Sequence, residues 1–245
     1  MRGPLFIGVT VAVVLWLWWS GNLSLYIHPR YHVFTAVMAA IAVIALVVFG
    51  ALRVARGKTL HEHVHDHDPK ATPAEWASTA IAGLALIALV VLPPATLTTQ
   101  TVDNRSINQS GLGDASAVFD EATTGQSDTF ASFTVREWAA ILSQTSDPSF
   151  YAGKPVDVIG FVSEDPEDSE QFFLTRFVVS CCSVDAQPVG IPVRLPGWRE
   201  LYAEEQWLTI SGQFVLNPSG ESTEPIVLSP ANVEPSERPN EPYLF

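Results

Sequence analysis

The stretch VFTAVMAAIAVIALVVFGAL, from Val33 to Leu52, contains twenty consecutive residues without a charged side chain. A helix that crosses the hydrocarbon core of a bilayer needs ~20 such residues. The basic residues Arg53, Arg56 and Lys58 follow at once and would lie outside the hydrocarbon. We therefore predict a transmembrane helix here, and we expect part of the chain to lie in lipid.

Two further apolar stretches flank this one. Pro4 to Trp19 comes before it and does not end in a small-residue cleavage motif, so we interpret it as an uncleaved helix rather than a signal peptide. Trp76 to Leu92 comes after it and ends at Pro93-Pro94, where continuing a helix is costly. The sequence thus predicts a membrane α-helical domain of three transmembrane helices in residues 1–97.

The charges of the two short loops predict the orientation of these helices. The first loop carries only Arg30, whereas the second carries four basic residues, Arg53, Arg56, Lys58 and Lys70. Loops rich in Lys and Arg stay in the cytoplasm. We therefore expect a multi-pass protein of the cell membrane, with a cytoplasmic N-terminus and an extracytoplasmic segment after residue 93.

Composition and charge exclude one large class of partner. The chain is 47% hydrophobic and only 16% charged, with a formal net charge of −13. Residues 93–245 hold seven Lys and Arg against twenty-two Asp and Glu. Binding to a phosphate backbone requires clustered basic residues. We therefore expect no nucleic acid partner.

The extracytoplasmic segment divides into a linker and a folded domain. Residues 98–129 are dominated by Thr, Ser, Asn, Gln, Asp and Gly, with Phe119 as their only aromatic residue before position 130. Such a composition buries too little apolar area to offset the entropy of ordering. We therefore predict a flexible linker at 98–129 and a β-rich domain at 130–245.

Local patterns predict the elements of the β-rich domain. Thr134-Val135-Arg136-Glu137 matches a capping box, which opens a helix with Phe133, Trp138, Ile141 and Leu142 on one side. Five short strand patterns follow, with a bend expected at Gly160. They are Val156–Val162, Gln171–Ser180, Gly190–Leu195, Trp207–Leu216 and Pro225–Leu228. We predict an extracytoplasmic mainly-β domain, an OB-like five-stranded barrel with one preceding helix.

A histidine-rich loop at residues 59–70 is the first candidate site. Four of the six histidines of the chain stand within seven residues, interleaved with acids. Imidazole and carboxylate groups together suit Zn²⁺ or another divalent transition metal. We predict a metal site formed by His61, His63, His65, His67, Asp66 and Asp68. The alternative is a solvated loop that responds to pH.

Cys181, Cys182 and Asp185 form a second candidate site after a predicted strand. Three interpretations compete: buried packing residues, a thiolate metal site with Asp185, or a redox pair. A relaxed disulfide between neighbours is disfavoured, because Cα atoms in normal bridges lie ~4.4–6.8 Å apart, against ~3.8 Å for adjacent residues. We find no Ser-His-acid set, phosphate-binding loop or HExxH motif, so no catalytic or cofactor-binding residues are assigned.

The order of motifs along the whole chain resembles the YcgQ-like family of bacterial membrane proteins. The resemblance includes the His/Asp-rich loop, and its most specific part is the segment from Arg176-Phe177 to Asp185-Ala186. Further matching motifs are Ser20-Gly21-Asn22-Leu23, Tyr26-Ile27, Pro93-Pro94-Ala95-Thr96-Leu97, Gly160-Phe161-Val162 and Glu241-Pro242-Tyr243.

The resemblance implies an integral-membrane accessory subunit that works beside a YcgR-like permease, with no established enzymatic activity. The positions that could then be functional are Arg176, Cys181, Cys182 and Asp185. The alternatives are a thiol-dependent or redox extracytoplasmic enzyme that uses the two cysteines, and an envelope scaffold whose barrel only binds protein.

Overall fold

The computed structural model of the chain describes residues 2–57, 83–84, 97–125, 127–219 and 222–245. The chain divides into two compact units, Met1–Thr96 and Leu97–Phe245. The histidine-rich loop and almost all of the predicted third helix, Trp76 to Leu92, lie outside the described residues.

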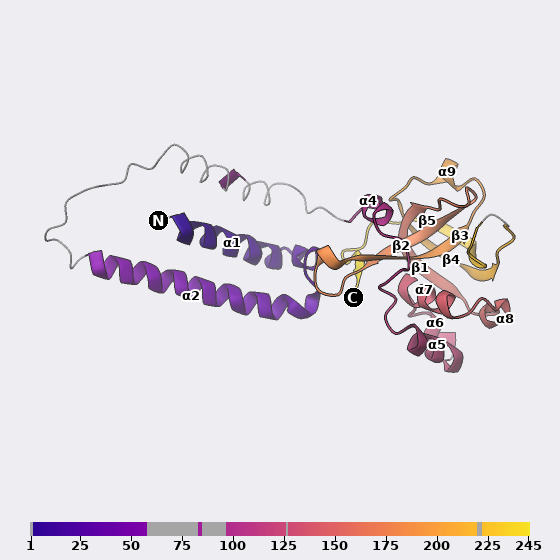
Figure 1. The fold of residues 1–245 in the computed structure, drawn as a ribbon, viewed down its shortest axis with the longest axis horizontal. Coiled ribbons are helices and arrows are strands. Elements are labelled where there is room, and N and C mark those ends of the chain that lie inside the picture. Colours follow the sequence, from indigo (N-terminus) through magenta and orange to yellow (C-terminus); the bar gives the residue numbers. More distant parts are fainter. Residues whose placement is uncertain (1, 58–82, 85–96, 126, 220–221) are drawn as a thin grey trace. The chain divides into compact units, whose positions relative to one another are not determined.

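Two helices and two short 3₁₀ turns form the described part of the first unit. Helix α1 spans Arg2–Trp19, η1 spans Asn22–Leu25, η2 spans Pro29–Tyr31 and α2 spans His32–Gly57. The two helices run antiparallel beside each other (Figure 1), and a Cβ on Gly8 would lie 3.8 Å from Leu46 Cδ1. The connection turns at Gly21, whose φ of 75° suits glycine.

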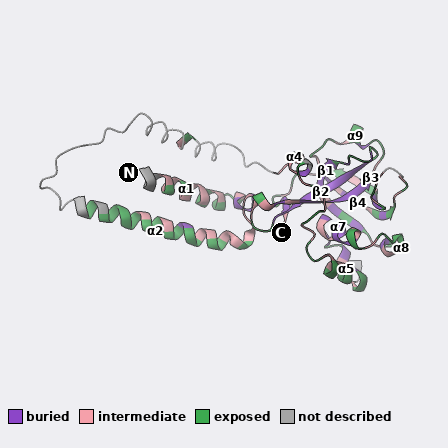
Figure 2. Ribbon diagram, in the orientation of Figure 1, coloured by how far each residue is buried: buried purple, intermediate pink, exposed green. Residues whose placement is uncertain are grey.

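Among the described residues, one helical stretch, Pro29–Leu52, is long and apolar enough to cross a membrane, judged by length and composition. Only 6% of its most apolar 18-residue segment is buried, and Figure 2 shows most of α2 as exposed or intermediate. Its exposed side chains include Val33, Phe34, Val37, Ile41, Ile44 and Val47. The apolar part of α1, Phe6–Trp19, is shorter. The structure therefore supports one of the three predicted spans, and the other two stay predictions.

The second unit is a mainly-β domain with short helices. Its first helices are α4 (Thr99–Asp103), α5 (Ala115–Thr124), α6 (Ser127–Phe130), α7 (Val135–Gln144) and α8 (Pro148–Tyr151). The remaining elements are β1 (Val156–Glu164), β2 (Gln171–Val178), η3 (Ser183–Asp185), β3 (Gln187–Arg194), α9 (Trp198–Leu201), β4 (Trp207–Leu216), β5 (Ile226–Pro235) and β6 (Tyr243–Leu244).

The strands β1, β4, β5, β3 and β2 follow one another around a ring, which closes because β1 also pairs with β2. Most neighbours are antiparallel, but β3 and β5 are parallel and meet at Val193 and Leu228. This junction is much narrower than the β4–β5 pairing, which runs from Leu208–Pro235 to Leu216–Ile226. The domain is therefore a five-stranded ring rather than a clear barrel.

Glycine at position 160 allows β1 and β2 to approach each other within the ring. A Cβ on Gly160 would lie 2.8 Å from the carbonyl oxygen of Thr175 and 2.9 Å from Leu174 Cγ. Both distances are shorter than real Cβ contacts allow, so any larger residue would push the two strands apart. The structure thus shows a close approach of β1 and β2 at Gly160, and the bend expected there stays a prediction.

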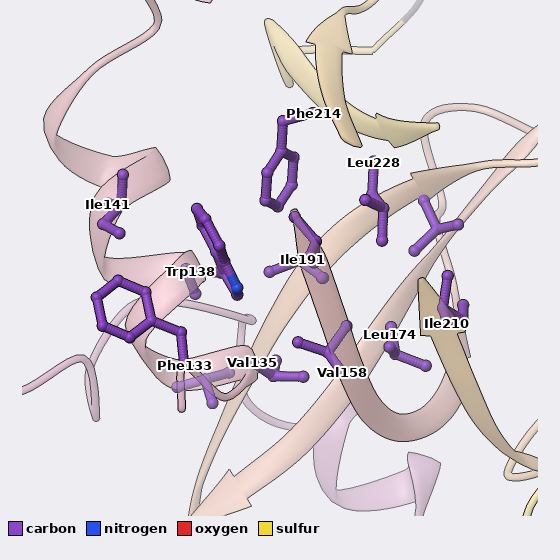
Figure 3. Close-up of a cluster of buried hydrophobic side chains, with 14 of the residues drawn as sticks. Phe133, Val135, Trp138, Ile141, Val158, Leu174, Ile191, Ile210, Phe214 and Leu228 are labelled. Carbon is purple, nitrogen blue, oxygen red and sulfur yellow. The ribbon is translucent and has the colours of Figure 1, made fainter. Parts of the chain in front are cut away.

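Helix α7 packs its apolar side on the ring, and Trp138 is the centre of this contact (Figure 3). Trp138 is fully buried, with ring centroids 5.2 Å from Phe214, 5.5 Å from Phe133 and 5.8 Å from Phe130. Its indole nitrogen has no hydrogen-bond partner among the described residues. The indole therefore stabilises the domain by apolar burial and aromatic packing.

The predicted capping box at the start of α7 is confirmed. The Thr134 side chain accepts a hydrogen bond from the Arg136 amide at 3.2 Å, and the Thr134 amide donates to Glu137 Oε2 at 2.8 Å. These bonds satisfy amide groups that have no partner within the helix. The helix therefore begins where the sequence predicts.

The segment 98–129 is not the flexible linker that its composition predicts. It contains α4 and α5, and Asn108 is tied to β3 through three hydrogen bonds. The Asn108 side chain donates to the Gly190 carbonyl at 2.8 Å and accepts from the Gly190 amide at 2.9 Å, while the Asn108 amide donates to Pro188 at 3.1 Å. Polar residues here are ordered by hydrogen bonds to a strand, which a count of apolar residues cannot detect.

Replacing Thr134 with alanine should lower the free energy of unfolding by about 1 kcal/mol, because the change removes the hydroxyl that caps α7. Denaturant unfolding of the detergent-purified protein measures this loss. Thr134→Ser keeps the hydroxyl and should unfold like the wild type. Equal stability of the alanine and serine variants would show that the cap contributes nothing.

Candidate thiol and carboxylate site between β2 and β3

Cys181, Cys182 and Asp185 lie in the loop of residues 180–186, which joins β2 to β3 and contains η3. Both cysteines are free thiols; Cys181 is exposed and Cys182 is half-buried. The interpretation of both cysteines as buried packing residues is therefore wrong. Their neighbour Val184 is 78% exposed, so the loop presents thiols and an apolar side chain at the surface.

The Asp185 carboxylate holds the loop together from inside. Its two oxygens accept hydrogen bonds from the Ser180 amide at 3.1 Å and from the Cys181 amide at 2.7 Å, and the Asp185 amide donates to the Cys182 carbonyl at 2.9 Å. Partial burial would raise the pKa of Asp185, but hydrogen bonds from the thiol and amide of Cys181 and from neighbouring amides outweigh it and lower that pKa. Asp185 is thus an anion at neutral pH.

The two thiols and this carboxylate lie close together. The Sγ atoms of Cys181 and Cys182 are 3.3 Å apart, and one donor atom from each of the three residues lies within 4.8 Å of the others. A hydrogen bond to Asp185, and then one to Cys182, raise the pKa of the Cys181 thiol to about 12. Cys181 is therefore protonated at neutral pH and is a weak nucleophile by itself.

Arg105 holds the same loop from outside. Its guanidinium donates hydrogen bonds to the carbonyl oxygens of Ala186 and Val184, the second at 2.9 Å. Arg105 stands about 80 residues before the loop, within the segment that composition predicts as a linker. No local sequence pattern connects it to the cysteines, so the sequence alone does not predict its role.

Strand β6 pairs with the end of β2, where the loop begins, and Arg176 fixes the residues before β6. Beyond the parallel pairing of β6 with β2, the Val179 amide donates to the Leu244 carbonyl at 2.9 Å. Arg176 is only 6% exposed, and its guanidinium donates to the carbonyls of Pro242 at 2.9 Å and Glu241 at 3.0 Å. Burial lowers the pKa of Arg176 to about 10. Arg176 therefore has a structural role: it anchors the residues that precede β6.

The other predicted site lies outside the described residues. His61, His63, His65, His67, Asp66 and Asp68 all fall in the range 58–82, so the structure does not report their positions. The described cluster of potential metal ligands is the Cys181, Cys182 and Asp185 group.

A hollow of about 540 Å³ near the β1–β2 turn has an acidic lining that includes Glu164, Asp165, Glu167 and Glu224. Several of its carboxylate oxygens already accept internal hydrogen bonds. Asp165 accepts from the Gln171 side chain at 2.6 Å and from the Glu167 amide at 2.8 Å, while Glu167 accepts from the Thr223 amide at 3.0 Å. These bonds stabilise the turn, and we assign the hollow no ligand.

Comparison with known proteins connects both parts of the chain to one family. Residues 3–108 match the DUF1980 N-terminal domain, and residues 120–245 match the DUF1980 C-terminal domain. A protein of Streptococcus mutans serotype c (strain ATCC 700610 / UA159), named provisionally as a two-component membrane permease complex subunit, is 27% identical over 100 residues. The match covers 40% of this chain and 36% of that protein, so the chain spans about a third of its length.

A solved structure described as OBody AM3L09 bound to hen egg-white lysozyme is similar to part of the chain. It is 16% identical, and the match covers 37% of this chain and 88% of that chain. The TM-score of 0.23 is too low for an argument about the fold.

Replacing Arg105 with alanine should loosen the loop of residues 180–186 without unfolding the ring. A hydrogen bond from a charged donor contributes about 1.5–3 kcal/mol, and 1.4 kcal/mol is tenfold in an equilibrium constant. Hydrogen–deuterium exchange of the loop amides should therefore accelerate at least about tenfold, with β1 and β4 unchanged.

The matched control is Arg199→Ala, which removes an ion pair with Glu164 at the surface and should leave exchange in the loop unaltered. Unchanged loop exchange in Arg105→Ala would show that the loop is held without this guanidinium.

Proposed function

The chain belongs to the DUF1980 family, and we propose that it is a membrane-anchored accessory subunit of a permease complex. The observation that carries this proposal is the apolar stretch Pro29–Leu52, which lies mostly in helix α2 and exposes most of its side chains. Exposed apolar surface costs about 25 cal/mol per Å² in water, and lipid or another membrane helix removes that cost. The printed name of the Streptococcus mutans relative supports the role of a subunit.

The finer parts of the proposal are the partner and the topology. We infer a YcgR-like permease as the membrane partner, following the resemblance to the YcgQ-like family. We propose three spans, with Pro4–Trp19, Val33–Leu52 and Trp76–Leu92 crossing the bilayer, a cytoplasmic N-terminus and an extracytoplasmic β-rich domain. The four basic residues between the second and third spans support this orientation.

We also propose that the five-stranded ring is a distorted OB-like barrel. The closed strand order and the packing of helix α7 on the ring support this proposal. In the accessory role, the ring would contact the permease or its cargo outside the membrane.

Hydrogen bonds to Asp185 and Cys182 raise the pKa of Cys181, whereas nucleophilic and redox cysteines act as thiolates with lowered pKa values, so Cys181 lacks this feature of a thiol-dependent enzyme. A scaffold that only binds protein differs from the proposed subunit in its partner. Co-purification therefore separates these two roles.

An affinity-tagged chain, expressed in its own host and extracted in mild detergent, should retain the YcgR-like permease in a fixed ratio. An unrelated multi-pass protein of similar abundance, tagged in the same way, is the control and should retain none. Recovery of the chain with soluble envelope proteins but without the permease would favour the scaffold.

Cysteine labelling tests the orientation. In a Cys181→Ser, Cys182→Ser background, Ser116→Cys should react with an impermeant maleimide in intact cells, because Ser116 is an exposed residue of α5 in the β-rich domain. Thr59→Cys should react only after the membrane is permeabilised. The reverse pattern would place the histidine-rich loop outside the cell and overturn the orientation.

We further propose that the histidine-rich loop binds a divalent metal such as Zn²⁺ on the cytoplasmic side. Replacing His61, His63, His65 and His67 with alanine should remove most Zn²⁺ or Ni²⁺ that the loop contributes to the detergent-purified protein, because imidazole supplies its neutral donors. The control replaces His28 and His32 with glutamine, outside the loop. Unchanged metal content in the fourfold variant would assign the metal elsewhere.

A further inference from the structure

The loop of residues 180–186 brings two thiols and one carboxylate to a single point at the protein surface. We propose that Cys181, Cys182 and Asp185 bind a thiophilic divalent cation of the Zn²⁺ class, with a fourth position open to solvent or a partner. The donor atoms lie within 4.8 Å of one another. This site goes beyond the permease role and uses no residue of the histidine-rich loop.

The donor set selects the class of metal. Two sulfur ligands and one oxygen suit Zn²⁺ and related ions, whereas Ca²⁺ and Mg²⁺ prefer oxygen ligands alone. With Zn–S bonds of ~2.3 Å, two thiolates of a tetrahedral site lie about 3.8 Å apart. The observed Sγ–Sγ distance is 3.3 Å, so a small rotation of the two side chains accommodates the ion.

Asp185 can bind a metal while it holds the loop. Its oxygens accept from the amides of Ser180 and Cys181, which uses one lone pair on each. An ionised carboxylate has about four such positions, and the one that accepts from the Cys181 thiol becomes available to a cation when that thiol loses its proton. When the metal binds, the Cys181 and Cys182 thiols release their protons to solvent and coordinate as thiolates.

Hydrogen bonds from other segments of the domain fix the conformation of the loop without any metal. Arg105 holds the carbonyls of Val184 and Ala186, and the Leu244 carbonyl holds Val179 at the end of β2. A structural zinc site is closed by four protein ligands and supplies folding energy. Here three ligands stand on a loop that is already ordered, and Cys181 is exposed. This arrangement suits a site that exchanges its ion with a partner.

Cobalt provides a direct test on the full-length, reduced protein in detergent. Thiolate ligands give Co²⁺ a charge-transfer absorption in the near ultraviolet, which imidazole and carboxylate ligands do not. Titration with Co²⁺ should produce this band, and Zn²⁺ should remove it by competition. The fourfold alanine variant of the histidine-rich loop should retain the band, so the result is independent of that loop and of the permease.

Cys181→Ser and Cys182→Ser should each abolish the two-thiolate band. Loss of residues that merely support a metal site costs about 10–100-fold in affinity, so loss of a thiolate ligand should exceed about 100-fold. Asp185→Asn should keep the band but weaken binding, whereas Ser183→Ala, in the same loop, should match the wild type. Absence of the band in the wild type, or its survival in either cysteine variant, would overturn the site.

Discussion

The burial of Trp138 against the ring is the contact on which the β-rich domain depends. The strand pairings that close the ring differ in length. β3 and β5 pair only at Val193 and Leu228, whereas β4 and β5 pair from Leu208–Pro235 to Leu216–Ile226. A ring of this kind is stabilised by an apolar element that packs on it. Helix α7 supplies it, and the capping box fixes the first turn so that the indole reaches Phe214. The loop with the two cysteines joins β2 to β3, two strands of this ring.

Much of this framework is predictable from the sequence because its signals are local. The capping box at Thr134 and the strand bounds of β4 follow directly from residue patterns. The extent of β5 does not, since Pro230 and Pro235 look like strand breakers, yet both pair with β4. The ordered structure of residues 98–129 is also not predictable from composition, because the Asn108 side chain forms hydrogen bonds with the backbone of β3 as a neighbouring strand would. Such pairing depends on a partner 82 residues away, and composition carries no trace of it.

The candidate site also combines features that the local sequence predicts with features that depend on distant residues. Cys181, Cys182 and Asp185 stand within five residues, so their proximity is predictable from the sequence, and the structure brings their donor atoms together. Their exposure was not predictable, because small sulfur side chains are more often buried. Arg105 and Leu244 come from distant segments. Arg105 donates to backbone carbonyls of the loop, and Leu244 accepts through its own carbonyl; backbone carbonyls have no signature in a sequence. Only the folded chain identifies the groups that shape the loop.

Arg176 also has a consequence for the order of events during synthesis. Its guanidinium is buried beside the Trp207 ring, and it donates to the carbonyls of Glu241 and Pro242, which leave the ribosome after every strand of the ring. Until they arrive, the ring would enclose a cation that lacks two of its acceptors, which is unfavourable. A chain that lacks Glu241 and Pro242 would therefore leave the buried Arg176 guanidinium without these two acceptors.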